Sequence, residues 1–115
     1  MKTNILIALG IIAAMVVAYL LHNVFPARSP MDEYLEEVEE AILAEEWPKV
    51  RAIIKKIDEE WKRSRLLIGI NNSRLDMQEF TRTLAILQAY AKVEDRASAY
   101  AEAAHLKERW WGFAE

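Results

Sequence analysis

Glu102-Ala103-Ala104-His105 is the stretch of this sequence whose residue types and spacing come closest to a chemical site. A Glu and a His three residues apart share one side of a helix, and such pairs bind metal in carboxylate-bridged helical bundles. That arrangement needs a second Glu-x-x-His copy and carboxylates from two further helices, all directed inward. The sequence has no second copy, and both residues flank the apolar stripe of their helix. We therefore interpret Glu102 and His105 as a surface pair.

Nucleophilic catalysis is not indicated either, because an activated hydroxyl needs a positioned base and the chain has two histidines. The four serines lie in no activating motif: Ser29, Ser64, Ser73 and Ser98. Ser29 and Ser73 are better interpreted as helix caps. Gly69, in "LIGI", is interpreted as a helix terminator rather than as part of a phosphate loop. The chain has no cysteine. We expect no catalytic activity, no metal site and no cofactor.

Residues 5–21 form an apolar run without a charged side chain. As a helix this run is about 25 Å long, enough for a bilayer core when Val24 and Phe25 extend it. A cleaved signal peptide is the alternative, but the best cleavage site, Ala27-Arg28-Ser29, lies well beyond the run and precedes Pro30. The sequence therefore predicts a retained transmembrane signal-anchor at 1–25, a linker at 26–30 and a helical soluble domain at 31–115.

The charge of the domain limits its partners. All 18 acidic residues and 13 of the 15 basic residues follow Pro30, which gives residues 31–115 a formal net charge of −5. Nucleic-acid binding requires a basic face that replaces counterions, and electrostatic binding of anionic lipid requires basic clusters. We expect neither. Lys2 and the N-terminal amine favour an orientation with the N-terminus inside the cell, which predicts a single-pass protein of the bacterial cell membrane with an extracytoplasmic domain.

Three glycines and three prolines disfavour a β-rich fold, and the apolar residues of the domain recur at helical spacing. Pro30 and Pro48 suit the first turns of two helices, and Gly69 with "NNS" ends the second. A third helix is expected over about 74–91 and a fourth from a cap at Asp95 to about Trp111. The predicted fold is all-α: an N-terminal transmembrane helix followed by a four-helix domain of two antiparallel hairpins.

A shift of 49 residues superposes the two predicted hairpins. It aligns Met31, Leu35, Val38 and Ile42 with Phe80, Leu84, Leu87 and Ala91, and Val50, Ile54, Ile57 and Trp61 with Ala99, Ala103, Leu106 and Trp110. These matches suggest two hairpins of one design. Acidic side chains in residues 30–47 and basic ones in 48–65 are expected to attract one another across the first hairpin.

"RWWGFAE" at the C-terminus holds three aromatic residues close together. If Trp110 continues the buried stripe, Trp111 and Phe113 lie to one side of it, and exposed aromatic residues are typical of interfaces. Trp47, at the turn between the first two helices, completes the candidate partner surface. In the alternative interpretation, the C-terminal aromatics cover the open end of a small bundle. Contact with the adjacent bilayer, where Trp is frequent, is a further possibility.

Several features together resemble a family of small bacterial proteins catalogued as domain of unknown function 4363. These are the N-terminal apolar segment, the Glu-rich first helix, "EEWPKV" between helices, Trp61 late in the second helix, and "NNSRLD" before the third. The resemblance implies a single-span or signal-bearing helical protein of Gram-positive, often spore-forming bacteria, with no assigned activity. It also implies a His near position 72, where this chain has Asn72. No site residue is transferred.

The sequence favours a membrane-tethered helical interaction or scaffold module of the bacterial envelope, with a protein partner in the envelope and without catalysis. The anchor, the missing catalytic constellation and the C-terminal aromatics support this interpretation. The alternative is a domain that binds a lipid or another hydrophobic small molecule between the Ala-rich helices, secreted if the N-terminus is cleaved. That alternative predicts an apolar cavity of ligand size.

Overall fold

The computed structural model describes residues 2–24, 30–70 and 72–113, with the side chains of the first segment described over residues 3–19. The described chain forms helices and no strand, which confirms the all-α prediction. The helices are α1 (Lys2–Val24), α2 (Met31–Leu43), α3 (Trp47–Ile68), α4 (Arg74–Lys92) and α5 (Arg96–Phe113). Ser29, which was predicted to cap α2, and the predicted linker apart from Pro30 lie outside the described residues.

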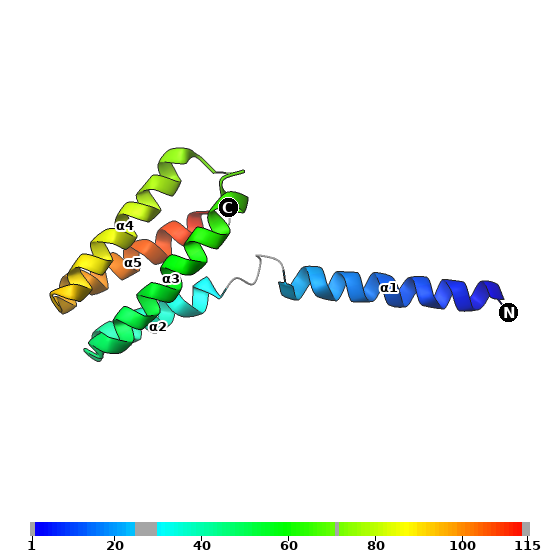
Figure 1. Ribbon diagram of the computed structural model, residues 1–115, viewed down its shortest axis with the longest axis horizontal. Helices are drawn as coiled ribbons and strands as arrows, with labels where there is room; N and C mark the ends of the chain where they lie inside the picture. Colours follow the sequence, from blue (N-terminus) through cyan, green and yellow to red (C-terminus); the bar gives the residue numbers. More distant parts are fainter. Residues whose placement is uncertain (1, 25–29, 71, 114–115) are drawn as a thin grey trace.

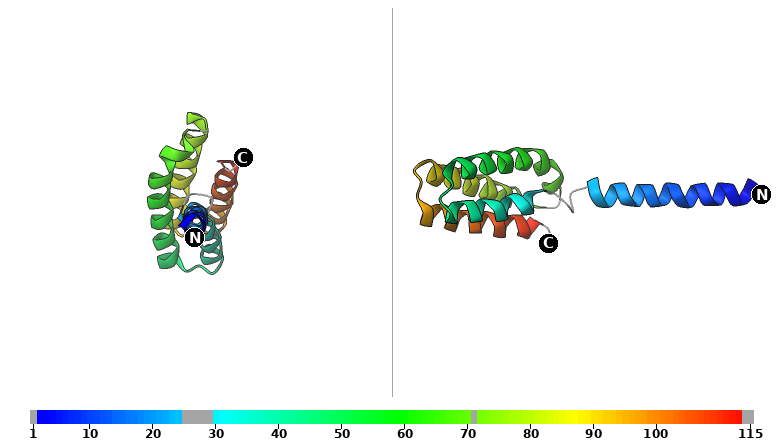
Figure 2. Two further views of the ribbon diagram at one scale, coloured as in Figure 1. Left: turned by 90° about the vertical axis from the view of Figure 1, so that its right-hand side faces the viewer. Right: turned by 90° about the horizontal axis from the view of Figure 1, so that it is seen from below.

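Helices α2 to α5 form a bundle of two antiparallel hairpins (Figure 1). Within the hairpins α2 packs against α3 and α4 against α5, and the hairpins meet through α2 with α5 and through α3 with α4. The turns inside the hairpins lie at the end of the bundle far from α1. The start of α2, the end of α3, the start of α4 and the end of α5 lie at the near end, here called the α1 end (Figure 2).

The predicted repeat is visible in the backbone of the two hairpin turns. Glu45 and Glu94, 49 residues apart, both have positive φ, 56° and 57°. The amide that follows each one donates a hydrogen bond back into the preceding helix, from Glu46 to Ala41 O at 3.0 Å and from Asp95 to Tyr90 O at 3.1 Å. A left-handed residue followed by such a bond is a Schellman cap. Both hairpins therefore use one turn geometry.

The helix ends agree with most of the predicted signals. Ser73 caps α4 by accepting a hydrogen bond from the Asp76 amide at 3.1 Å. Asp95 caps α5 by accepting one from the Ser98 amide at 3.2 Å. The aligned apolar residues of the repeat are all buried except Trp110, which is partly buried. The core of the bundle therefore follows the helical spacing read from the sequence.

The acidic side chains of α2 were expected to attract the basic side chains of α3, but a charged residue of each helix pairs with the second hairpin instead. Glu39 of α2 pairs with Lys107 of α5 at 2.8 Å. Arg51 of α3 pairs with Glu94, beyond the end of α4, at 3.6 Å. Helix α2 has α5 on its second side, and this neighbour supplies the cation for Glu39.

Helix α1 extends away from the bundle (Figure 1), and each of residues 3–19 is exposed. Between Ile5 and Val17 its side chains are apolar on every side of the helix. Among the described residues, no helix combines the length and the hydropathy that a membrane crossing requires. The structure therefore gives no support to the predicted transmembrane span at residues 1–25.

Candidate interaction surface

Trp47 lies in the core, although it was predicted to belong to a partner surface. The side chain is 7% exposed and packs in the hydrophobic cluster of the bundle. Trp47 is the first residue of α3, ahead of Pro48 in the first turn, and Glu46 stands as the N-cap. Because the chain has already reversed direction at Glu45 and Glu46, the first turn of α3 packs back against the bundle. We assign Trp47 to the core of the first hairpin.

Phe113 joins an aromatic cluster at the α1 end of the bundle. Its ring stacks on Trp61, with centroids 5.6 Å apart and planes inclined by 18°, and lies 5.8 Å from Phe80. Trp110 approaches Phe113 edge-on at 6.3 Å. Such pairs contribute about 0.5–1.5 kcal/mol each beyond the area they bury. This arrangement matches the interpretation in which a C-terminal aromatic side chain covers the open end of the bundle.

Trp111 is the member of the predicted surface that stays exposed, with 51% of its surface accessible. Its indole Nε1 donates a hydrogen bond to Asp32 Oδ1 at 3.2 Å. Lys107 Nζ lies 5.3 Å from the centroid of the ring, within the range of a cation–π contact. The indole thus connects the end of α5 to the start of α2 and still presents surface to solvent.

Lys107 joins Trp111 to the α2–α5 interface. Its Nζ lies 2.8 Å from Glu39 Oε1, and the two side chains are largely buried. The hydrogen bond to Glu39 raises the pKa of Lys107 above its ordinary value of 10.5, against an opposing effect of desolvation. Lys107 is therefore charged at neutral pH, and its ammonium group holds Glu39 and Trp111 on one side of α5.

Sequence reasoning missed the contacts of Asp32 and Lys107. Trp111 and Asp32 are 79 residues apart, and nothing in the sequence predicts that the end of α5 meets the start of α2. Part of the signal was available, because Lys107 and Trp111 are four residues apart and share a side of the helix. The spacing identifies the face of α5 but not the helix opposite.

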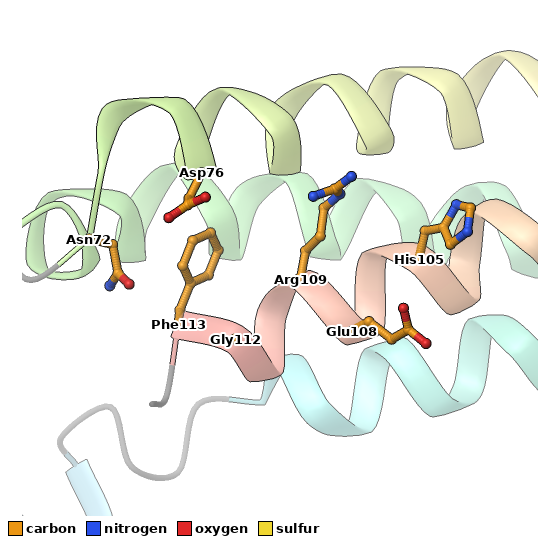
Figure 3. A pocket seen from close by; sticks show the side chains of 7 residues that line it. All are labelled: Asn72, Asp76, His105, Glu108, Arg109, Gly112 and Phe113. Atoms are coloured by element: carbon orange, nitrogen blue, oxygen red, sulfur yellow. The ribbon is translucent and has the colours of Figure 1, made fainter.

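A cavity of about 510 Å³ lies between α4 and α5 at the α1 end of the bundle. Figure 3 shows its lining residues: Asn72, Asp76, His105, Glu108, Arg109, Gly112 and Phe113. The Phe113 side chain points from α5 toward Asp76, and Arg109 points toward α4 (Figure 3). Arg109 is engaged there, because its Nε donates a hydrogen bond to Thr83 Oγ1 at 3.0 Å and its Nη2 lies 3.5 Å from Glu79. The cavity is lined mainly by polar side chains.

The candidate metal pair remains a surface pair. His105 Nδ1 lies 3.8 Å from Glu102 Oε2, and the His105 side chain is 60% exposed. Within the described residues, no three His, Cys, Asp or Glu side chains gather in a way that would hold a metal ion. Asn72, at the position where the resemblance implies a His, donates a hydrogen bond from Nδ2 to Ile68 O at 2.9 Å. Asn72 therefore helps to end α3.

Comparison with known proteins gives one match. No curated protein and no solved structure matches the chain significantly. The model of one protein family, described as a domain of unknown function (DUF4363), matches residues 18–110. This match includes the end of α1 and nearly all of the four-helix bundle. The chain therefore belongs to the DUF4363 family.

Proposed function

We propose that this protein is a membrane-tethered interaction module, in which α1 lies in the bacterial cell membrane and the helical bundle binds another protein of the envelope. The observation that carries the proposal is the exposure of every residue from 3 to 19, in a helix that is apolar on all sides. Such a helix needs an apolar environment around its whole circumference. The backbone of α1 is helical over 23 residues, or about 35 Å, somewhat longer than a hydrocarbon core of about 30 Å.

The proposed docking residue for the protein partner is Trp111. Exposed tryptophans are over-represented among the residues that dominate binding energy at interfaces. The hydrogen bond to Asp32 and the contact with Lys107 fix the orientation of the indole, so its exposed face is presented with little loss of side-chain entropy on binding.

Membrane tethering is tested with the full chain and one substitution in α1. We expect the wild-type protein to stay with the membrane pellet after washing in alkaline carbonate. Ile12→Arg places a charge near the centre of α1, at a cost of about 2.5–3.5 kcal/mol in a membrane, and should release a large share of the protein. The matched control is Val93→Arg, in the exposed turn at the far end of the bundle, which should stay in the pellet. Equal behaviour of the two variants would contradict tethering by α1.

The partner surface is tested by photo-crosslinking in the native host. A photoreactive phenylalanine analogue replaces Trp111 in one strain and Tyr100, which is 37% exposed on the same helix, in another. We expect a discrete crosslinked protein from position 111 that is missing from position 100. Identical patterns from both positions, or no adduct from position 111, would contradict a docking role for Trp111.

The alternative function, binding of a hydrophobic ligand between the Ala-rich helices, has less support. Ala99 and Ala103 are fully buried in the core. The cavity between α4 and α5 is lined by charged side chains, including Asp76, Glu108 and Arg109, which suit a polar molecule better than a lipid tail.

A further inference from the structure

Several exposed apolar side chains lie around the connection between α3 and α4, where residues 65–70 and 72–75 are here called the α3–α4 corner. Four large apolar side chains of the corner are more than half exposed: Leu66 (81%), Leu67 (53%), Ile70 (76%) and Leu75 (65%). Outside α1, few large apolar side chains of the described chain are exposed to this degree. A cluster of this kind at a protruding corner is typical of a surface that contacts a partner or a membrane.

The corner is basic, although the domain as a whole is acidic. Residues 65–75 contain two basic side chains, Arg65 and Arg74, and no acidic one, and Lys62 and Arg63 precede them in α3. Lys62 and Arg63 are paired with Asp58 and Glu60 of the preceding turns, at 3.0 and 2.8 Å. No described residue forms an ion pair with Arg65 or Arg74. These two guanidinium groups are therefore available for an anion from outside.

A cavity next to the corner combines the same arginines with an apolar floor. It has a volume of about 420 Å³ and lies between α3 and α4. Arg65, Arg74 and Arg82 contribute to its lining, together with Trp61 and Met77. The Trp61 side chain is fixed there, because its Nε1 donates a hydrogen bond to Thr81 Oγ1 at 3.0 Å. Guanidinium groups beside an apolar surface suit an amphiphile with an anionic head, since Arg binds phosphate oxygens in a two-pronged geometry.

The corner also lies at the end of the bundle that faces α1. The end of α3 and the start of α4 belong to the α1 end, as does the start of α2 (Figure 2). Five residues lie between Val24, the last residue of α1, and Pro30, and the six Cα–Cα steps from one to the other reach at most about 20 Å. A bilayer that holds α1 would thus lie within a short distance of the corner.

We propose that the α3–α4 corner is a second membrane contact, which inserts Leu66, Ile70 and Leu75 into the bilayer interface and binds the phosphates of anionic phospholipids through Arg65 and Arg74. The proposal rests on the proposed membrane tethering by α1. Tethering raises the local concentration of lipid at the corner, so weak contacts suffice for docking. The net charge of −5 opposes this contact only through the acidic side chains near the bilayer, because those farther away than about 8 Å are largely screened.

The test places a single fluorescent label at the corner of the full chain. The protein has no cysteine, so Ile70→Cys gives one labelling site for a polarity-sensitive dye. Val93→Cys is the matched control, because Val93 is 71% exposed in the turn at the opposite end of the bundle. Both labelled proteins are reconstituted in nanodiscs of phosphatidylcholine, with or without phosphatidylglycerol, that contain lipids with a nitroxide on the headgroup. Alkaline washing of the same proteins in vesicles measures tethering by α1 separately.

We expect strong nitroxide quenching of the label at position 70 in anionic bilayers, weaker quenching in phosphatidylcholine alone, and little quenching at position 93. Arg65→Gln with Arg74→Gln should lower the docked fraction relative to the undocked one by about 30-fold in anionic bilayers. Lys55→Gln with Lys92→Gln, two exposed cations away from the corner, should leave quenching at position 70 unchanged.

Several outcomes would overturn the proposal. Quenching at position 70 that is the same in both bilayers and insensitive to the arginine substitutions would exclude recognition of phosphate. A label at position 70 that becomes buried without quenching by lipid would indicate a second copy of the chain or a protein partner. If the fluorescence of the label at position 70 does not change in a protein that resists the alkaline wash, the second membrane contact is contradicted, whereas tethering by α1 is not. Release by the wash would contradict tethering and, with it, docking.

Discussion

At the residue scale, burial separates the aromatic side chains near the two ends of the bundle into those that pack in the core and those that keep an exposed face. Phe113 and Trp47 pack into the bundle, while Trp111 keeps an exposed face above Lys107. The sequence places Trp111 and Phe113 beside the buried stripe of α5 but does not reveal which of them meets a neighbouring helix. That distinction depends on the contacts of α5 with α2 and α3, which are set by packing across the bundle.

Substitution by alanine should separate these two roles. We expect Phe113→Ala to lower the free energy of unfolding by about 2 kcal/mol, less than a fully buried ring would cost, because Phe113 is partly exposed. Trp111→Ala should lower it by about 1 kcal/mol or less, since it removes one exposed hydrogen bond and a cation–π contact. Urea titration of the full chain in mild detergent measures both changes. A larger loss for Trp111→Ala would contradict the assignment of Phe113 to the core cluster.

The Lys107–Glu39 pair should give a pH dependence of known sign. A lysine whose pKa is raised on folding stabilises the fold fully below its unfolded pKa, about 10.5, and loses this contribution as the pH rises through the folded value. We expect Lys107→Gln to lower the free energy of unfolding by about 1 kcal/mol at pH 7, with a difference from wild type that shrinks above pH 10.5.

The matched control for this pair is Lys62→Gln. Lys62 and Asp58 approach to 3.0 Å, similar to the Lys107–Glu39 distance, but the Lys62 side chain is 65% exposed. An exposed pair four residues apart on a helix contributes about 0.3–0.5 kcal/mol. Equal losses for the two lysine substitutions at pH 7, in urea titrations monitored by circular dichroism, would show that the contact between α2 and α5 adds nothing beyond a surface pair.

At the element scale, the helices were predictable because each one carries its own boundary signals. Ser73, Asp95 and Pro48 mark three helix starts, and the apolar spacing indicates the buried faces. The partner of each helix beyond its own hairpin was not predictable, since α2 with α5 and α3 with α4 meet through residues far apart in the chain. For the same reason the α3–α4 corner was missed: Gly69 in "LIGI" was interpreted as a helix terminator, and the exposure of the neighbouring apolar side chains became clear only in the bundle.

The two hairpin turns offer an element-scale test. Glu45 and Glu94 occupy left-handed conformations, which cost a residue with a Cβ about 1 kcal/mol relative to glycine. We expect Glu45→Gly to raise the free energy of unfolding by about 0.5–1 kcal/mol. Glu94→Gly should raise the free energy of unfolding by a smaller amount, because this substitution also removes the ion pair with Arg51.

Glu46→Gly is the control for the turns. Glu46 has φ of −84° and stands outside the left-handed region, so glycine relieves no strain there and adds flexibility to the unfolded chain. We expect this variant to be no more stable than wild type in thermal unfolding followed by circular dichroism. A gain at position 46 equal to that at position 45 would show that the benefit does not come from the turn conformation.

At the scale of the whole molecule, the positions of the charged and exposed apolar residues indicate more about membrane contact than the net charge and the overall composition do. The net charge of the domain suggests no affinity for anionic lipid, yet the α3–α4 corner combines Arg65 and Arg74 with four exposed apolar side chains and lies at the end nearest α1. We expect the bundle to be held close to the membrane at this end, with its hairpin turns directed away. Composition alone hides this polarity, because it averages over both ends of the bundle.

The retention of α1 is the claim on which this arrangement depends. The most direct measurement is the intact mass of the protein from its native host, taken separately on alkaline-washed membranes and on the soluble fraction. We expect the full chain, with a mass of 13.3 kDa, in the washed membranes. A shortened protein that begins near Pro30 and is found in the soluble fraction would contradict membrane tethering and would favour a diffusible binding domain.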